Sequence, residues 1–198
     1  MRLIDFKGMS FLFFNLISVL YFQANQSSPK FLLMNSVLIW KRGFFSSSCK
    51  VFLNQSIGAI LKSSFDFSTV YLDLNTKRYE FRTKGLFKPN TVIVDVENQS
   101  IVGNITYNGW SNKAFVHFQN EMAFWKMSGI GCTSWSMMNP VEGDVVYKGS
   151  ITDGTFFYEG ENLLYPLTGL FVRYYFYQVS LSMLLAVMVP LVVIMLTR

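Results

Sequence analysis

Residues 91–107, TVIVDVENQSIVGNITY, contain two apolar, strand-like runs joined by a polar turn. The turn repeats an earlier one, because residues 54–57 and 98–101 both read NQSI and each follows an apolar run. Asn tolerates a positive φ in a turn, and the glycine that follows in each copy permits a bulge or a close backbone contact. The second copy has one extra residue, Val102, before its glycine. We therefore predict two β-hairpins of the same kind.

Further strand-like runs extend outward from these hairpins, separated by Gly, Asn, Asp and Ser. In residues 79–84 the Tyr, Phe and Thr share one face, whereas the charged side chains share the other. Most runs recur at roughly 8 to 12 residues, which is typical of a sandwich or a barrel. The predicted strands are 31–40, 49–53, 57–62, 69–74, 78–83, 91–96, 101–107, 114–118, 123–127, 133–137, 144–148 and 155–158.

The C-terminal segment has a different character, because 24 uncharged residues, YYFYQVSLSMLLAVMVPLVVIMLT, lie between Arg173 and Arg198. At about 1.5 Å per residue, a helix of this length crosses a hydrocarbon core of about 30 Å. The tyrosines at its start suit the interfacial aromatic belt, and a proline is tolerated in spanning helices. The apolar side chains that we assign to this helix are Val179, Leu184, Leu185, Val187, Pro190, Val193 and Leu196.

Two interpretations of this helix stay open. Its most apolar part, residues 183–196, is also the length of a helix buried inside a protein. A closed sheet has no exposed edges, and a central helix would fill the space inside it, so we lean slightly to the central position. The expected fold is mainly β, an antiparallel barrel or sandwich of about twelve strands with a C-terminal apolar α-helix, central or membrane-spanning.

The expected organisation has three parts: an N-terminal apolar segment at 1–29, a β-rich body at 30–166 and the apolar helix at 167–198. Residues 9–22 are apolar, follow Arg2 and Lys7, and precede a polar stretch. This pattern resembles a signal peptide or an uncleaved anchor. Asp5 and Asn15 interrupt it, so two alternatives stay open: the segment is the first element of the body, or Met9 is the true start of a shorter product.

Charge is unevenly distributed along the chain, whose net charge is +5. Basic residues dominate 30–88, and acidic residues dominate 89–165. No zinc-finger spacing or aromatic RNA-binding signature accompanies the basic part, so we expect no nucleic-acid partner. The candidate residues for binding a lipid headgroup or another anion are Lys77, Arg78, Arg82, Lys84 and Lys88.

The strand pattern followed by an apolar helix resembles the group of tubby, LURP-one-related and phospholipid-scramblase proteins. Residues 93–105, IVDVENQSIVGNI, carry a local version of the pattern as strand, Asp, turn, apolar residue and Gly. The resemblance spans roughly residues 31–196 and implies a twelve-stranded barrel around a C-terminal helix. It also implies phosphoinositide or membrane-surface binding, or lipid handling. The proline within this helix departs from the group, and the chain has neither its acidic calcium-binding run nor its cysteine-rich stretch.

The sequence contains no pattern typical of an enzyme, so we expect no catalytic site, metal site or cofactor. His117 is the only histidine and has no acidic or cysteine neighbour in sequence. Cys49 and Cys132 form no disulfide framework and are expected to be buried thiols. Trp110, Trp125 and Trp135 are expected in the core rather than in a groove. The acidic residues Glu142, Asp144, Asp153, Glu159 and Glu161 lack calcium-loop spacing and suit solvated turns.

Three functional hypotheses follow. The first is a non-catalytic β-domain that is bound to a membrane or to lipid, either anchored by its helix or peripheral. The second is a soluble, cytoplasmic barrel that hides the helix and binds a protein or a small ligand. An unrecognised enzyme is the third and the least supported. Arginines flank both ends of the helix, so the positive-inside rule does not decide the topology.

Overall fold

The computed structural model describes residues 36–43, 46–64, 68–85, 88–119, 121–128 and 133–196. The predicted N-terminal segment at 1–29 lies outside these residues, as do the first residues of the predicted strand at 31–40. Cys132 also lies outside them. The structural description therefore covers the β-rich body and the C-terminal helix.

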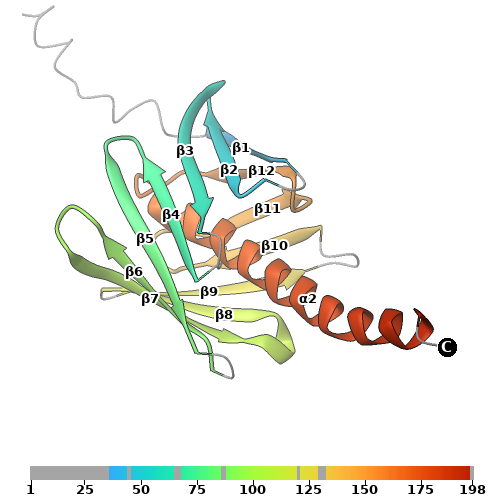
Figure 1. The fold of residues 1–198 in the computed structure, drawn as a ribbon. Coiled ribbons are helices and arrows are strands. Elements are labelled where there is room, and N and C mark those ends of the chain that lie inside the picture. The colour runs from blue at the N-terminus through green and yellow to red at the C-terminus, as the bar shows by residue number, and fades with distance from the viewer. Residues whose placement is uncertain are drawn as a thin grey trace, which may run out of the picture. The chain divides into compact units, whose positions relative to one another are not determined.

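Twelve strands form one closed antiparallel barrel in which each strand pairs with its neighbours in sequence, and β1 pairs with β12 to close it (Figure 1). The prediction of about twelve strands in an antiparallel barrel is confirmed, and the alternative of a sandwich is wrong. The strands are β1 Ser36–Arg42, β2 Ser48–Leu53, β3 Ser56–Ser63, β4 Thr69–Leu74, β5 Lys77–Lys84, β6 Asn90–Asp95, β7 Ser100–Asn108, β8 Lys113–Phe118, β9 Glu121–Ser128, β10 Ser134–Met138, β11 Val145–Gly149 and β12 Asp153–Tyr158. A short 3-10 helix, η2 Gly109–Ser111, connects β7 to β8.

The two NQSI turns connect β2 to β3 and β6 to β7, and both hairpins contain a bulge. In the first hairpin Phe52 pairs with Ile57 and Val51 with Ala59, so Gly58 is the extra residue. The second skips Val102 in the same way. The return strands of the two hairpins therefore match, and Val102 occupies the bulge position of Gly58 rather than an insertion. The loops differ, because residues 54–55 connect the strands of the first hairpin and residues 96–99 connect those of the second.

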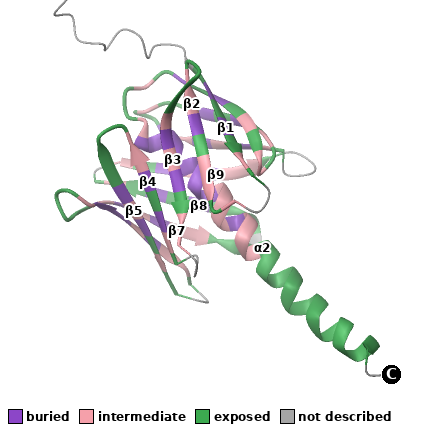
Figure 2. Cartoon of the chain, turned by 45° about the horizontal axis from the view of Figure 1, so that its top comes forward, coloured by how far each residue is buried: buried purple, intermediate pink, exposed green. Residues whose placement is uncertain are grey.

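A single helix, α2 Leu164–Leu196, follows the last strand and begins three residues before the predicted start at 167. Pro166 sits in its first turn, where the missing N–H has no intrahelical partner to lose. Its first half fills the barrel, and its second half extends beyond the barrel (Figures 1 and 2). The core is thus shared between the inward side chains of the strands and one half of α2.

Candidate membrane-binding surface

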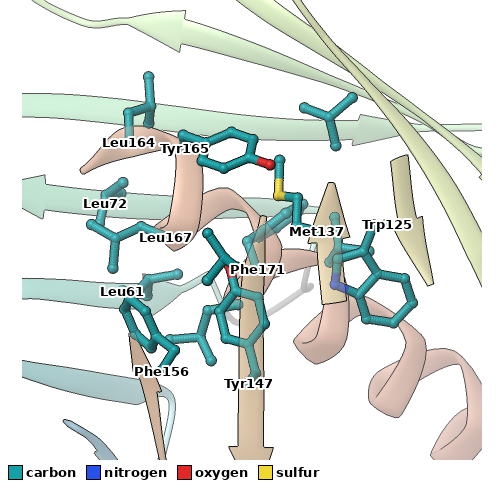
Figure 3. Close-up of a cluster of buried hydrophobic side chains, with 14 of the residues drawn as sticks. Leu61, Leu72, Trp125, Met137, Tyr147, Phe156, Leu164, Tyr165, Leu167 and Phe171 are labelled. Atoms are coloured by element: carbon teal, nitrogen blue, oxygen red, sulfur yellow. The ribbon is translucent and has the colours of Figure 1, made fainter. Parts of the chain in front are cut away.

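The inner half of α2 is held by aromatic side chains of the barrel wall (Figure 3). The Tyr147 hydroxyl donates a hydrogen bond to the Pro166 carbonyl at 2.7 Å, and Trp125 Nε1 donates to the Gly169 carbonyl at 3.0 Å. Phe171 stacks on Phe81, with ring centroids 4.3 Å apart. Burial raises the pKa of Tyr147 well above its usual value, so its hydroxyl remains a donor at neutral pH. These bonds fix the depth of the helix in the barrel.

Gly169 lies where the helix and the wall approach most closely. A Cβ atom at this position would overlap the hydroxyl oxygen of Tyr147 and would lie 3.0 Å from Met137 Sδ. Only glycine lets the helix backbone come near enough for the two hydrogen bonds described above. The residue therefore determines how tightly the helix sits in the barrel.

The helix leaves the barrel through a mouth lined by aromatic and arginine side chains. The Arg42 guanidinium lies 4.3 Å from the Tyr174 ring centroid and donates a bond of 3.3 Å to its hydroxyl. The same hydroxyl donates to Ser63 Oγ at 3.0 Å. Tyr175 stacks on Tyr107 at 4.0 Å. Beside Arg42 and Tyr174 the mouth contains a cavity of about 20 Å³, which is room for about one water molecule.

Beyond the mouth the helix is exposed along its whole circumference. Every side chain from Ser180 to Leu196 is exposed, including Leu184 at 57%, Val187 at 61% and Leu196 at 81%. Val193 and Pro190 lie in this part, and Val179, which is half-buried, lies at its start. The most apolar stretch of 18 residues in the helix has none of its residues buried. The expected central position is therefore confirmed for the inner half of the helix, whereas the outer half is not covered by the barrel.

The exposed half, taken as residues 177–196, is long enough to cross a bilayer. Twenty helical residues span about 30 Å, which matches a hydrocarbon core. Gln178, Ser180 and Ser182 lie at the barrel side of this segment, within about 8 Å of its start. Pro190 removes the N–H that would bond the Ala186 carbonyl, a defect that spanning helices tolerate.

The barrel has two chemically different ends. Because successive strands are antiparallel, the odd-numbered strands finish, and the even-numbered strands begin, at the end from which α2 emerges. We call this the exit end and the opposite one the far end. Seven lysines lie near the exit end and make no ion pair with another described residue. All are exposed except Lys126, which is half-buried. We call them the basic collar: Lys41, Lys50, Lys84, Lys88, Lys113, Lys126 and Lys148.

Acidic side chains lie mainly at the far end. They are Asp73, Asp95, Glu97, Glu121, Glu142, Asp144, Glu159 and Glu161. Within the described part of the chain, Asp153 is the acidic residue at the exit end, where it accepts a hydrogen bond from Ser150. The five acidic residues predicted in solvated turns therefore do not lie together. Asp153 lies at the exit end, and the remaining four lie at the far end.

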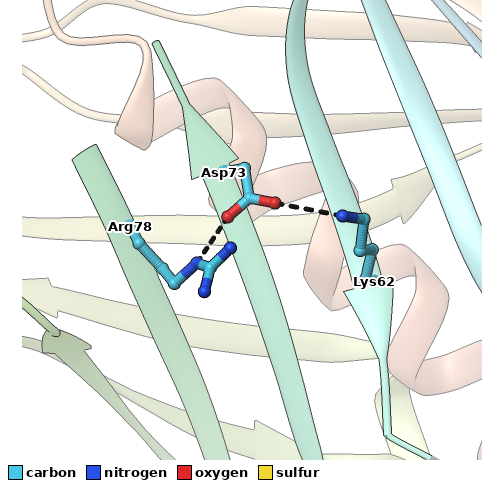
Figure 4. A network of polar contacts seen from close by, with 3 residues as sticks. All are labelled: Lys62, Asp73 and Arg78. Carbon is cyan, nitrogen blue, oxygen red and sulfur yellow. Dashed lines mark hydrogen bonds and ion pairs between the residues drawn. The ribbon is translucent and has the colours of Figure 1, made fainter. Parts of the chain in front are cut away.

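The predicted anion-binding residues are divided between the two ends of the barrel. Lys77 and Arg78 start the strand at the far end, whereas Arg82, Lys84 and Lys88 lie toward the exit end. Arg78 Nε bonds Asp73 at 2.6 Å and Lys62 bonds the same carboxylate at 3.3 Å (Figure 4). Arg82 is paired with Glu80 at 2.6 Å. The structure therefore leaves Lys84 and Lys88 as the members of this set that belong to the basic collar.

Sequence reasoning missed the other five lysines of the collar. They are spread over β1, β2, β8, β9 and β11, so they form no cluster in sequence. The signal that finds them is strand direction, because a predicted meander assigns each strand terminus to one of two ends.

The side chains considered for catalysis or metal binding lie apart. His117 is exposed on the outer face of β8, and no group of three or more His, Cys, Asp or Glu in the described residues could hold a metal ion. Burial raises the pKa of the Cys49 thiol to about 11, which makes it a poor nucleophile at neutral pH. Trp125 and Trp135 are fully buried, which confirms their core position. The side chain of Trp110 lies outside the description.

Comparison of the chain with protein-family models, with curated proteins and with solved structures found no match.

Proposed function

We propose that this protein is a non-catalytic β-barrel domain held at a lipid bilayer by the outer half of α2. The observation that carries the proposal is the complete exposure of residues 180–196, which are uncharged and almost entirely apolar. Soluble proteins rarely leave a continuous apolar surface of this kind in water. In a lipid bilayer, acyl chains would surround this segment on every side.

The apolar content of the segment is sufficient for insertion. Residues 177–196 contain eleven Leu, Val and Ile. At about 0.3 to 0.6 kcal/mol each, they favour transfer into a bilayer by roughly 3 to 7 kcal/mol before the cost of the polar residues. Those polar residues lie at the end nearest the barrel, where the transfer cost is lowest.

We also propose that the barrel and its anchor form one unit, because the inner half of α2 is part of the barrel core. A barrel that binds a small ligand inside needs an open lumen, but here the helix fills it. The filled lumen argues against the alternative of a soluble barrel with a ligand cavity. A protein partner that wraps the outer half is the remaining form of that alternative.

Kinship with the group of tubby, LURP-one-related and phospholipid-scramblase proteins is part of the same proposal. It is supported by the number of strands, their antiparallel closure and the C-terminal helix in the lumen. We carry over no binding residue from that group.

The test compares the full chain with two truncations after expression in cells. A chain that ends at Val179 keeps every buried residue of α2 and is expected to fold and to remain soluble. A chain that ends at Asn162 lacks the central helix and is expected to collapse, because the emptied lumen leaves a large cavity. The full chain is expected in the carbonate-resistant membrane fraction.

Circular dichroism and thermal melting report folding of the truncated chains, and carbonate extraction reports anchoring. A full chain that is completely soluble, or one released from membranes by carbonate, contradicts anchoring. Recovery of the full chain in a soluble complex with another protein supports the alternative in which a partner covers the helix.

A further inference from the structure

We infer that the basic collar is a docking surface for the anionic headgroups of the bilayer into which the outer half of α2 inserts. The inference rests on the proposed function and names the chemistry of the membrane surface. It assigns binding to a ring of separate lysines, not to a pocket for one headgroup. Its members lie on strands or loops around the barrel, all toward the end from which α2 emerges.

Position is the first argument. The inserted segment begins at about Tyr177, and the mouth of the barrel lies one helical turn before it, at Arg173 and Tyr174. When residues 177–196 cross the hydrocarbon core, the exit end therefore faces the headgroup layer. The acidic far end faces away from it. An anionic surface attracts the near end and repels the far one, so the charge distribution favours a single orientation.

The cross-strand partners within the collar give a second argument. Lys113 on β8 stands directly opposite Lys126 on β9, and Lys41 on β1 stands directly opposite Lys50 on β2. Like charges in directly opposed positions destabilise a sheet. Asp153 lies opposite Lys41 on the other side and compensates part of that charge. The Lys113–Lys126 pair has no such neighbour, because Asn108 and Ser136 occupy the adjoining positions.

The far end shows the opposite arrangement. Asp73 stands directly opposite Arg78 and is bonded to it, so the basic charge there is neutralised within the protein. Among the lysines that the structure describes, those without an ion pair are therefore confined to the exit end, apart from Lys77 at the start of β5. Negative charge supplied from outside would relieve the repulsion at the exit end. An anionic lipid surface is the occupant whose charge and position fit, because the inserted helix brings it to this end.

The test uses the full chain reconstituted into two kinds of vesicle: phosphatidylcholine alone, and phosphatidylcholine with phosphatidylserine. A carbonate wash and flotation first select inserted protein. The amines are then acylated briefly, and mass spectrometry measures the reaction rate of each lysine. We expect the collar lysines to react several-fold more slowly in the vesicles that contain phosphatidylserine, with the difference abolished at high salt. Lys77 should react equally in both.

Charge reversal supplies a matched set of variants. Lys50→Glu and Lys113→Glu each replace a repelling cross-strand pair by an attracting one, so the barrel should melt no lower than the parent. The double variant should weaken protection of the remaining collar lysines. Lys77→Glu makes the same charge change at the far end as each single variant and should leave the protection intact.

The outcomes separate the two proposals. If inserted protein shows equal lysine rates in both vesicles, or if Lys77 is protected as strongly as Lys113, the collar inference is wrong while anchoring stands. If the chain floats with neither kind of vesicle after carbonate, anchoring fails and the collar inference falls with it.

Discussion

Two lysines placed on the outer half of α2 test most directly whether this segment enters a membrane. Leu184 and Val187 are 57% and 61% exposed, so neither packs against the barrel. A lysine at the centre of a spanning helix costs about 2.5 to 3.5 kcal/mol, and the lost Leu or Val adds about 0.3 to 0.6. The double variant Leu184→Lys with Val187→Lys therefore loses roughly 6 to 8 kcal/mol of transfer free energy.

That loss equals or exceeds the roughly 3 to 7 kcal/mol by which the segment favours the bilayer. Each 1.4 kcal/mol is about a tenfold change in partition, so the double variant should move from the carbonate-resistant membrane fraction to the soluble fraction. Its melting temperature should match that of the soluble chain that ends at Val179, because the substituted side chains contact only solvent.

Gln178→Lys is the matched control. It adds a charge at the barrel side of the segment, where a lysine side chain can reach the headgroups, so it should remain membrane-bound. The reasoning is refuted if the double variant stays carbonate-resistant. It is also refuted if the double variant melts several degrees lower, since that would mean the outer half packs against the body.

Three further predictions concern the barrel. Gly169→Ala should destabilise the fold by about 1 to 3 kcal/mol, because its Cβ overlaps the Tyr147 hydroxyl, and thermal melting measures the loss. The hydrogen bond from Arg78 holds the pKa of Asp73 below its usual 3.8, so the stability from Asp73 is complete at neutral pH and is lost as the pH falls below that value. The variant Asp73→Asn should accordingly flatten the acid limb of a stability-versus-pH curve. In a Cys132→Ser background, Cys49 should alkylate roughly a hundredfold more slowly than free cysteine at pH 8, with a rate that rises toward pH 11.

The strands were predictable because one face of each is buried, and that imposes an alternation readable in sequence. The strand at 69–74 was predicted with the bounds that β4 has, and in β5 Tyr79 and Phe81 point inward as the alternation required. The NQSI repeat predicted two similar hairpins and the bulges that follow their turns. It could not show that Val102 is the bulged residue, because that depends on which residues pair across the strands.

The environment of the helix could not be predicted from hydropathy. Val172 is fully buried and Val193 is 52% exposed, yet both are valines within one continuous helix. Where the barrel ends decides which of them is covered, and this depends on the length and tilt of all the strands. The collar was hidden for a related reason, because Lys113 and Lys126 become neighbours only through the register of β8 with β9.

The continuity of α2 has a mechanical consequence. No loop separates the turns that bond Tyr147 and Trp125 from the turns proposed to lie among acyl chains. A tilt of the outer half within the bilayer would therefore tilt the whole barrel by the same angle, because one continuous helix joins them. One residue inserted after Phe176 would turn the outer half by about 100° and advance it by about 1.5 Å without altering either half. Such an insertion would change the orientation of the exit end relative to the membrane and would leave the core unchanged.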